Sequence, residues 1–147
     1  MEQPRYAGGC LCGAVRYEAA GAPRNLCYCH CESCRRAAGS PAVAWSTFER
    51  GSFRITRGTL TEFQSSQPVV RGFCARCGSC LTYRHEGRPE EIDVTIATLD
   101  EAAQLIPQMH VWVADKLPWV RIDDGLPQFS GSSGGSTSTV IGCAPTE

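Results

Sequence analysis

The segment Cys74-Ala75-Arg76-Cys77-Gly78 contains two cysteines three positions apart, followed directly by a glycine. On a tight turn this spacing aims both sulfurs at one ion, and backbone N–H groups of the turn can donate hydrogen bonds to them. The glycine tolerates the left-handed backbone that such a turn requires. Because the pair fills only half of a tetrahedral zinc site, the pattern predicts two more ligands elsewhere in the chain.

A second pair, Cys10-Leu11-Cys12-Gly13, can supply those ligands. We expect Cys10 and Cys12 to lie on a strand, where residues i and i+2 face the same side. With Cys74 and Cys77 they would form a structural Cys₄ zinc site that ties the N-terminal strand to the middle of the chain. Structural zinc contributes on the order of 10–16 kcal/mol of apparent binding free energy in small domains. A redox-active pair is the alternative, but no βαβ pattern surrounds the motif.

The segment Cys29-His30-Cys31-Glu32-Ser33-Cys34 carries a third group of cysteines. We expect Cys29, Cys31 and Cys34 to project from a strand-to-turn segment. Three protein ligands and one exchangeable position are the arrangement of a catalytic zinc, so these residues are the candidate open, catalytic site. Arg35 and Arg36 follow directly, where they would offset the anionic cluster and could bind a carboxylate of a substrate.

The alternative is that a fourth ligand closes this second site and makes it structural. Cys27, Cys80 and His30 are the candidates for that ligand. On an extended segment the side chain of His30 points away from Cys29 and Cys31, which favours a packing or hydrogen-bonding role. Glu32 is a candidate proton acceptor, although an exposed turn carboxylate is the simpler interpretation.

Composition favours metal binding over disulfides and limits the partners. The 147 residues include ten cysteines, and the N-terminal residues show no apolar signal-peptide segment, so we expect a cytoplasmic location. The formal net charge of −1, from 14 basic and 15 acidic residues, argues against binding to nucleic acid or to an anionic membrane. No apolar run is long enough to span a membrane.

Short alternating segments punctuated by glycine and proline predict an all-β domain of mainly antiparallel strands over residues 5–129. Helical signal is confined to Glu32–Ala38 and to Leu99–Gln104. A flexible Gly/Ser/Thr-rich tail is expected over 130–147, and it holds Cys143. The expected strands are Ala14–Glu18, Ala42–Thr47, Phe53–Thr56, Thr59–Ser65, Val69–Phe73, Cys80–Arg84 and Ile92–Ala97.

The remaining histidines and tryptophans have no ligand spacing. His85 and His110 are interpreted as ordinary polar positions. Trp112 and Trp119 flank Pro118 and can line a pocket wall, but packing of a C-terminal strand into the core is at least as good an interpretation.

Three ordered motifs together resemble the glutathione-dependent formaldehyde-activating enzymes, a family that also includes centromere protein V. The resemblance runs from Ala7 to Phe129 and includes His110-Val111-Trp112 and Leu126-Pro127-Gln128-Phe129. It implies a β-tent fold with zinc-linked sheets, a structural ion and a catalytic ion. The motifs that carry it are Gly9-Cys10-x-Cys12-Gly13, Cys29-His30-Cys31-x-x-Cys34-Arg35 and Phe73-Cys74-x-x-Cys77-Gly78.

The resemblance also implies an activity, with two Zn²⁺ ions per chain and a small-molecule thiol as substrate. The family's reaction joins glutathione and formaldehyde to S-(hydroxymethyl)glutathione, and its members are carbon–sulfur lyases. A homo-oligomer is compatible with such a small domain. Two other classes remain open: a non-catalytic binding module in which both zinc sites are structural, and a zinc or thiol sensor with labile metal.

Overall fold

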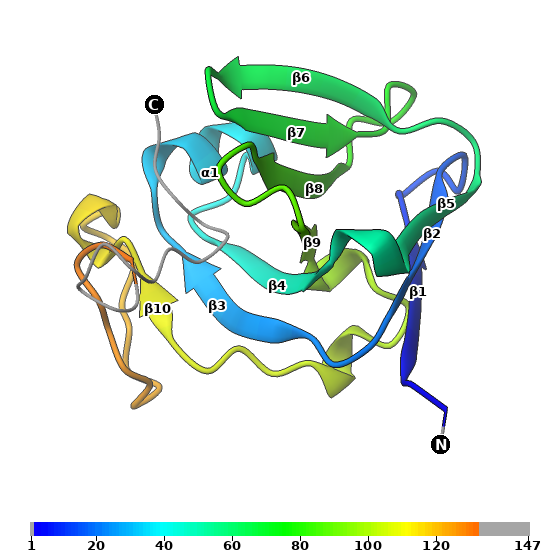
Figure 1. Ribbon diagram of the computed structural model, residues 1–147. Helices are drawn as coiled ribbons and strands as arrows, with labels where there is room; N and C mark the ends of the chain where they lie inside the picture. The colour runs from blue at the N-terminus through cyan, green and yellow to red at the C-terminus, as the bar shows by residue number, and fades with distance from the viewer. Residues whose placement is uncertain (1, 133–147) are drawn as a thin grey trace.

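Two β-sheets form the framework of the protein in a computed structural model, which describes residues 2–132 (Figure 1). A three-stranded sheet has the order β1-β2-β5, and a seven-stranded sheet has the order β10-β3-β4-β9-β8-β7-β6. The strands are β1 (Arg5–Gly9), β2 (Arg16–Ala20), β3 (Arg24–Cys29), β4 (Val43–Glu49), β5 (Phe53–Arg57), β6 (Thr61–Ser66), β7 (Val69–Phe73), β8 (Cys80–His85), β9 (Glu91–Thr95) and β10 (His110–Val111).

Helical structure is sparse in the described residues. One α-helix, α1 (Glu32–Ala38), accompanies four 3₁₀ turns: η1 (Arg50–Ser52), η2 (Ile96–Thr98), η3 (Ala102–Gln104) and η4 (Val113–Asp115). All strand pairs are antiparallel except β10 with β3, which is parallel. The prediction of a mainly antiparallel β protein with little helix is therefore confirmed. None of the helices within residues 2–132 has the length and apolar character needed to cross a membrane.

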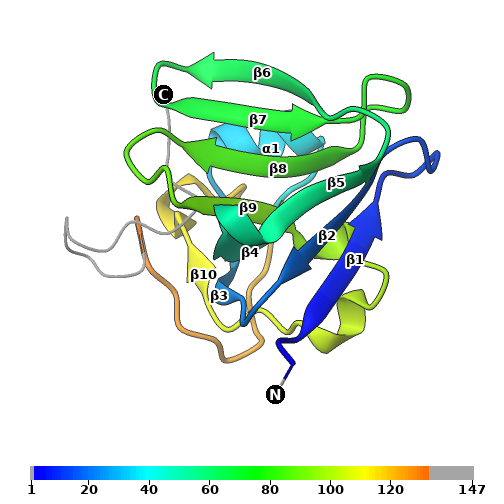
Figure 2. The ribbon, with the colours of Figure 1, turned by 45° about the vertical axis from the view of Figure 1, so that its right-hand side comes forward.

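Buried side chains cover both faces of the sheet around the central strands β4 and β9, and Figure 2 shows the three-stranded sheet on one side of them. One face packs against the three-stranded sheet in a cluster that includes Tyr17, Phe48 and Val94. The other face carries a second cluster, in which Trp45 and Tyr83 pack beside Cys29, Cys31 and Cys34. Successive side chains of a strand point to opposite faces, so β4 contributes Phe48 to the first cluster and Trp45 to the second.

Two segments have the predicted bounds. The helix α1 begins after Cys31, whose side chain accepts a hydrogen bond from the Cys34 N–H, and ends at Gly39, which adopts a left-handed φ of 63°. Glycine accommodates that backbone without a steric cost, which is why it terminates the helix. Strand β7 also spans Val69–Phe73 as expected. The expected helix over Leu99–Gln104 is shorter, because only η3 is helical there.

The expected strand around Cys10 and Cys12 is wrong. Strand β1 ends at Gly9, and the chain then turns, with the Gly13 N–H donating to the Cys10 carbonyl at 3.2 Å. Gly13 has a φ of 80°, a conformation that reverses the chain toward β2. The strand expected over Ala14–Glu18 consequently begins only at Arg16. Most of the expected tail over 130–147 lies outside the described residues, as does Cys143.

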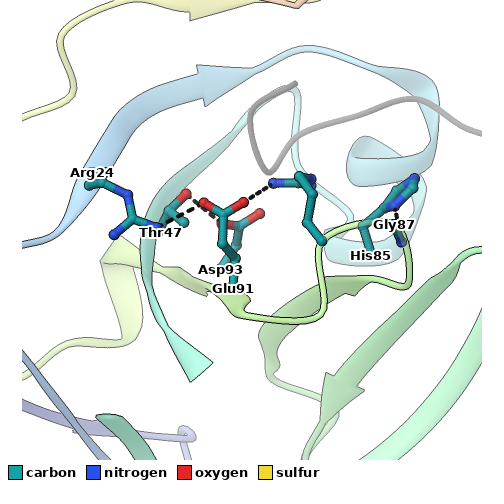
Figure 3. A network of polar contacts seen from close by, with 7 residues as sticks. Arg24, Thr47, His85, Gly87, Glu91 and Asp93 are labelled. Atoms are coloured by element: carbon teal, nitrogen blue, oxygen red, sulfur yellow. Dashed lines mark hydrogen bonds and ion pairs between the residues drawn. The ribbon is translucent and has the colours of Figure 1, made fainter. Parts of the chain in front are cut away.

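A buried carboxyl on β9 gives a pH-dependent stability. Asp93 is 2% exposed and accepts a hydrogen bond from the Thr47 hydroxyl at 2.6 Å, beside the Arg24–Glu91 ion pair (Figure 3). Burial raises the pKa of Asp93 from its ordinary 3.8 to about 7, although the Thr47 hydrogen bond acts in the opposite direction. The folded state therefore holds a proton that the unfolded state has released, and stability falls as pH rises toward and through 7.

We expect Asp93→Asn to remove this dependence. Between pH 6 and pH 8 the wild-type chain should lose about 1 kcal/mol of stability relative to the variant. Denaturant unfolding of both proteins across this range measures the difference. Thr47→Val is the matched control, because it removes the hydrogen bond and leaves the titrating carboxyl in place. Parallel stability curves for the wild type and Asp93→Asn would show that Asp93 does not titrate there.

Candidate functional site

Four sulfurs meet where the β1–β2 turn lies against the β7–β8 turn. The Sγ atoms of Cys10, Cys12, Cys74 and Cys77, here called the tetrathiol cluster, all lie within 4.8 Å of one another. The Cys10–Cys12 and Cys12–Cys74 sulfur distances are 3.6 and 3.8 Å. Tetrahedral zinc with Zn–S bonds of about 2.3 Å requires sulfur–sulfur distances of about 3.8 Å. The spacing therefore fits one zinc ion.

Three of these sulfurs receive hydrogen bonds from neighbouring backbone and side-chain groups. The Val15 N–H donates to Cys10 Sγ at 3.2 Å, and the Cys77 N–H donates to Cys74 Sγ at 3.4 Å. The Ser79 hydroxyl lies 3.2 Å from Cys77 Sγ, and this contact together with the Ser79 backbone lowers the pKa of Cys77 to about 5. A sulfur that is already an anion is the ligand that zinc needs.

A second group of sulfurs lies at the junction of β3 and α1. Cys29 ends β3, Cys31 caps α1 and Cys34 lies within it, and the three Sγ atoms are within 4.8 Å of one another. We call this group the trithiol cluster. All three residues are buried, with Cys29 and Cys34 fully so. The segment thus runs from strand β3 into the helix predicted over Glu32–Ala38, and the Cys31 side chain caps that helix.

The candidate fourth ligands do not join the trithiol cluster. Within residues 2–132, the sulfur and ring-nitrogen atoms of Cys27, Cys80 and His30 are not part of the group. Burial raises the pKa of Cys80 to about 11, which leaves it a neutral thiol near the cluster. The arrangement therefore offers three sulfur donors on one side of an ion.

The protons of the trithiol cluster are shared unevenly. Hydrogen bonds from Cys29 and Cys31, with Arg71 nearby, hold the pKa of Cys34 well below its ordinary value. The same contacts with Cys29 and Cys34 raise the pKa of Cys31. Three thiolates this close repel one another strongly unless a cation lies among them. The donor set is therefore suited to a thiophilic divalent cation, of which zinc is the common biological example.

A chain of two histidines and a carboxylate lies beside the trithiol cluster. Asp124 Oδ2 is 2.7 Å from His110 Nε2, and His110 Nδ1 is 2.9 Å from His30 Nε2. Because a carboxylate only accepts, His110 donates to Asp124 and accepts from His30 when both rings are neutral. Burial and the neighbouring His110 lower the pKa of His30 to about 4. The chain fixes the segment around Asp124 against β10 and β3.

The sequence predicted only part of this hydrogen-bonded series of His30, His110 and Asp124. It expected a packing or hydrogen-bonding role for His30, which agrees with the contact to His110. It treated His110 as an ordinary polar position, whereas His110 is 5% exposed and joins two partners. No sequence motif predicted a role for Asp124. No motif around His110 indicates that Asp124, fourteen positions later in the sequence, contacts its ring.

A shallow pocket of about 370 Å³ lies at the end of α1, and its lining includes Arg35, the residue that directly follows Cys34 in the sequence. The residues that line it include Arg35, Arg36, Leu117 and Trp119. Arg36 is already paired with Glu32 at 2.8 Å, so Glu32 has the role of an exposed surface carboxylate. The buried Nε of Arg35 has no hydrogen-bond partner among the described residues. Trp119 is 68% exposed, which fits a pocket wall and not a core strand.

A family model and one curated relative indicate the same family. The model of the family "Glutathione-dependent formaldehyde-activating enzyme" matches residues 5–115. A protein of Schizosaccharomyces pombe named as an uncharacterized lyase is 34% identical over 82 residues, which are 56% of this chain and 59% of that protein. A putative glutathione-dependent formaldehyde-activating enzyme of Halomonas elongata is 28% identical over 127 residues, covering 79% of this chain and 80% of that protein.

A solved structure supports the fold independently. The crystal structure of a Rhodobacter sphaeroides protein aligns with 84% of this chain and 98% of its own, with a TM-score of 0.52 and 24% identity. At this level of identity the match supports the fold alone. The chain spans 59% of the length of the Schizosaccharomyces pombe relative.

Proposed function

Because this chain belongs to the glutathione-dependent formaldehyde-activating enzyme family, we propose that it is a zinc-dependent carbon–sulfur lyase that interconverts S-(hydroxymethyl)glutathione with glutathione and formaldehyde. The observation that carries the proposal is the buried group of three sulfurs, to which residues 2–132 add no fourth ligand. A closed site would serve only stability, whereas three ligands leave a position for a substrate.

Each cluster would hold one zinc ion. In the proposal the tetrathiol cluster is structural and joins the three-stranded sheet to the β7–β8 turn, giving the zinc-linked β-tent. The trithiol cluster is the open site. Zinc bound there would supply an exchangeable Lewis-acid position that stabilises a substrate thiol as its thiolate. The Leu11 N–H, which donates to the Ser79 hydroxyl at 3.0 Å, reinforces the first junction.

The chemistry needs few protein groups. The glutathione sulfur adds to the formaldehyde carbon, a C–S bond forms, and the C=O π electrons move to oxygen, which then takes a proton. The reverse reaction breaks the same C–S bond. The protein contributes by excluding water around the buried trithiol cluster and by orienting the thiol substrate. A set of free thiols needs a reducing compartment, which supports the expected cytoplasmic location.

Exchange spectroscopy tests this proposal directly. Formaldehyde and glutathione combine without a catalyst, so the readout should be the rate of exchange between free and hydroxymethylated glutathione, followed by two-dimensional NMR. We expect the protein to accelerate exchange in proportion to its concentration. Cys80→Ala, which removes a thiol outside both clusters, should accelerate it equally. Exchange at the uncatalysed rate, with zinc bound at both clusters, would favour the non-catalytic binding module.

The pocket beside α1 predicts a substrate-binding residue. Glutathione carries two carboxylates, and Arg35 has a buried Nε without a partner. A charge-assisted hydrogen bond contributes roughly 1.5–3 kcal/mol. We therefore expect Arg35→Gln to raise KM for glutathione about tenfold with little change in kcat. Arg36→Gln is the matched control, since Arg36 is engaged by Glu32. Equal effects of the two substitutions would contradict a specific role for Arg35.

A further inference from the structure

A buried arginine on β7 contacts the trithiol cluster. Arg71 is 5% exposed, and its Nη1 lies 3.7 Å from Cys34 Sγ. It comes from the strand that leads into the tetrathiol cluster, so its position across from α1 is set by the pairing of β7 with β8. A buried cation is costly unless polar partners compensate it, and the Cys34 sulfur is one of the partners that the structure places beside Arg71.

Three contacts hold the guanidinium in a fixed orientation. Its Nε lies 3.3 Å from the Ser65 hydroxyl, and its carbon lies 5.2 Å from the centre of the Tyr83 ring, a cation–π distance. The third contact is Nη1 with Cys34. An arginine held on three sides is a preorganised group and not a surface side chain that reached a nearby sulfur.

One donor of this arginine is left over. The Nη2 atom is buried and has no hydrogen-bond partner among the described residues. A buried donor of a charged group without an acceptor is uncommon in folded proteins, and such an atom is often completed by a ligand. The free donor belongs to the same planar group that contacts Cys34, so an acceptor that completes it would lie close to the trithiol cluster.

The charges of the site point to the role of this residue. A divalent ion with three thiolates has a net charge of −1, and an anionic fourth ligand makes it −2. Placing such a charge in a buried site is unfavourable without a counter-charge. Arg71 is the arginine that contacts a sulfur of the trithiol cluster in the described part of the chain.

We propose that Arg71 is the counter-cation of the trithiol cluster, that its Nη1 stabilises the Cys34 thiolate, and that its Nη2 is the donor completed by an anionic fourth ligand. This inference rests on the proposed function, because it assumes that the trithiol cluster binds a metal ion. It makes Arg71 a positioning residue of the open site and favours a thiolate over a neutral molecule as the fourth ligand.

Chelator competition tests this role without any measurement of activity. Arg71→Met keeps most of the side-chain volume, and Arg71→Lys keeps the charge without the fork. Loss of an outer partner of a metal ligand typically costs 10–100-fold in metal affinity. We expect Arg71→Met to weaken zinc binding at the trithiol cluster by that factor, with a smaller loss for Arg71→Lys. Zinc at the tetrathiol cluster should be unaffected, which also reports that the variants are folded.

A second readout follows the fourth ligand. With cobalt in place of zinc, addition of a small thiol should perturb the visible spectrum of the wild-type open site at lower thiol concentration than in Arg71→Met. Arg84→Met is the control, because Arg84 lies on the neighbouring strand and pairs with Glu62 at 2.7 Å. Two bound zinc ions with unchanged affinities in Arg71→Met would overturn this inference alone. A wild-type chain without metal at the trithiol cluster would overturn the proposed function as well.

Discussion

Replacing Cys77 with alanine is expected to unfold most of the protein. The substitution removes one of the four sulfurs that join the β1–β2 turn to the β7–β8 turn. Structural zinc contributes on the order of 10–16 kcal/mol of apparent binding free energy, and a whole domain is stable by only about 5–15 kcal/mol. Loss of a large part of the zinc term is therefore enough to cancel the net stability.

Circular dichroism and a thermal melt measure this effect. The variant should lack a cooperative transition, or show one lowered by more than about 15 °C, because each kcal/mol shifts the midpoint of a domain this size by several degrees. Cys80→Ala is the matched control, since Cys80 lies three residues away, outside both clusters. If the thermal unfolding curve of Cys77→Ala coincided with that of Cys80→Ala, the tetrathiol cluster would not be needed for the stability of the fold.

Replacing Cys34 with alanine is expected to abolish activity and leave the protein folded. Cys34 is one of three sulfurs in the open cluster, and its side chain is fully buried. Changes to groups that only support a ligand cost 10–100-fold, so removal of the ligand itself should cost more than about 100-fold in catalysed exchange. The cavity left by one sulfur should lower stability by about 1–2 kcal/mol.

The comparison of these two variants separates the two clusters. Cys34→Ala should retain one zinc ion and a cooperative melt, whereas Cys77→Ala should retain neither. Cys27→Ala is the control for loss of a buried thiol on β3 outside the trithiol cluster. If Cys34→Ala and Cys77→Ala lost equal thermal stability, the division into a structural and an open site would be wrong.

Local signals explain what the sequence predicted well. A short run rich in β-branched and aromatic residues predicted Val69–Phe73, and Gly39 predicted the end of α1. The N-terminal strand was expected around Cys10 and Cys12 and not over Arg5–Gly9, where Gly8 and Gly9 have low strand propensity. Gly8 is required there by packing, since a Cβ at this position would lie 2.4 Å from the Tyr17 hydroxyl. This requirement for glycine arises from Tyr17 on the neighbouring strand β2, so the sequence around Gly8 does not reveal it.

The composition of the cysteine groups followed from spacing, but their surroundings did not. Cysteine motifs are recognisable in a sequence because two or three ligands occur within a few residues. Arg71, Asp93 and Asp124 belong to no motif with ligand spacing, and each acquires its role from a partner that is remote in sequence. An arginine in the otherwise apolar strand Val69–Phe73 was the one available signal, because a buried charge requires a nearby anion.

Zinc content tests the central claim most directly. The measurement is elemental mass spectrometry of zinc per chain, on protein purified without added metal and quantified by amino-acid analysis. Two clusters of sulfurs predict a value near two for the wild type, falling to near one in Cys34→Ala. A wild-type value near one would contradict the claim that the trithiol cluster is a metal site, and with it the proposed enzyme.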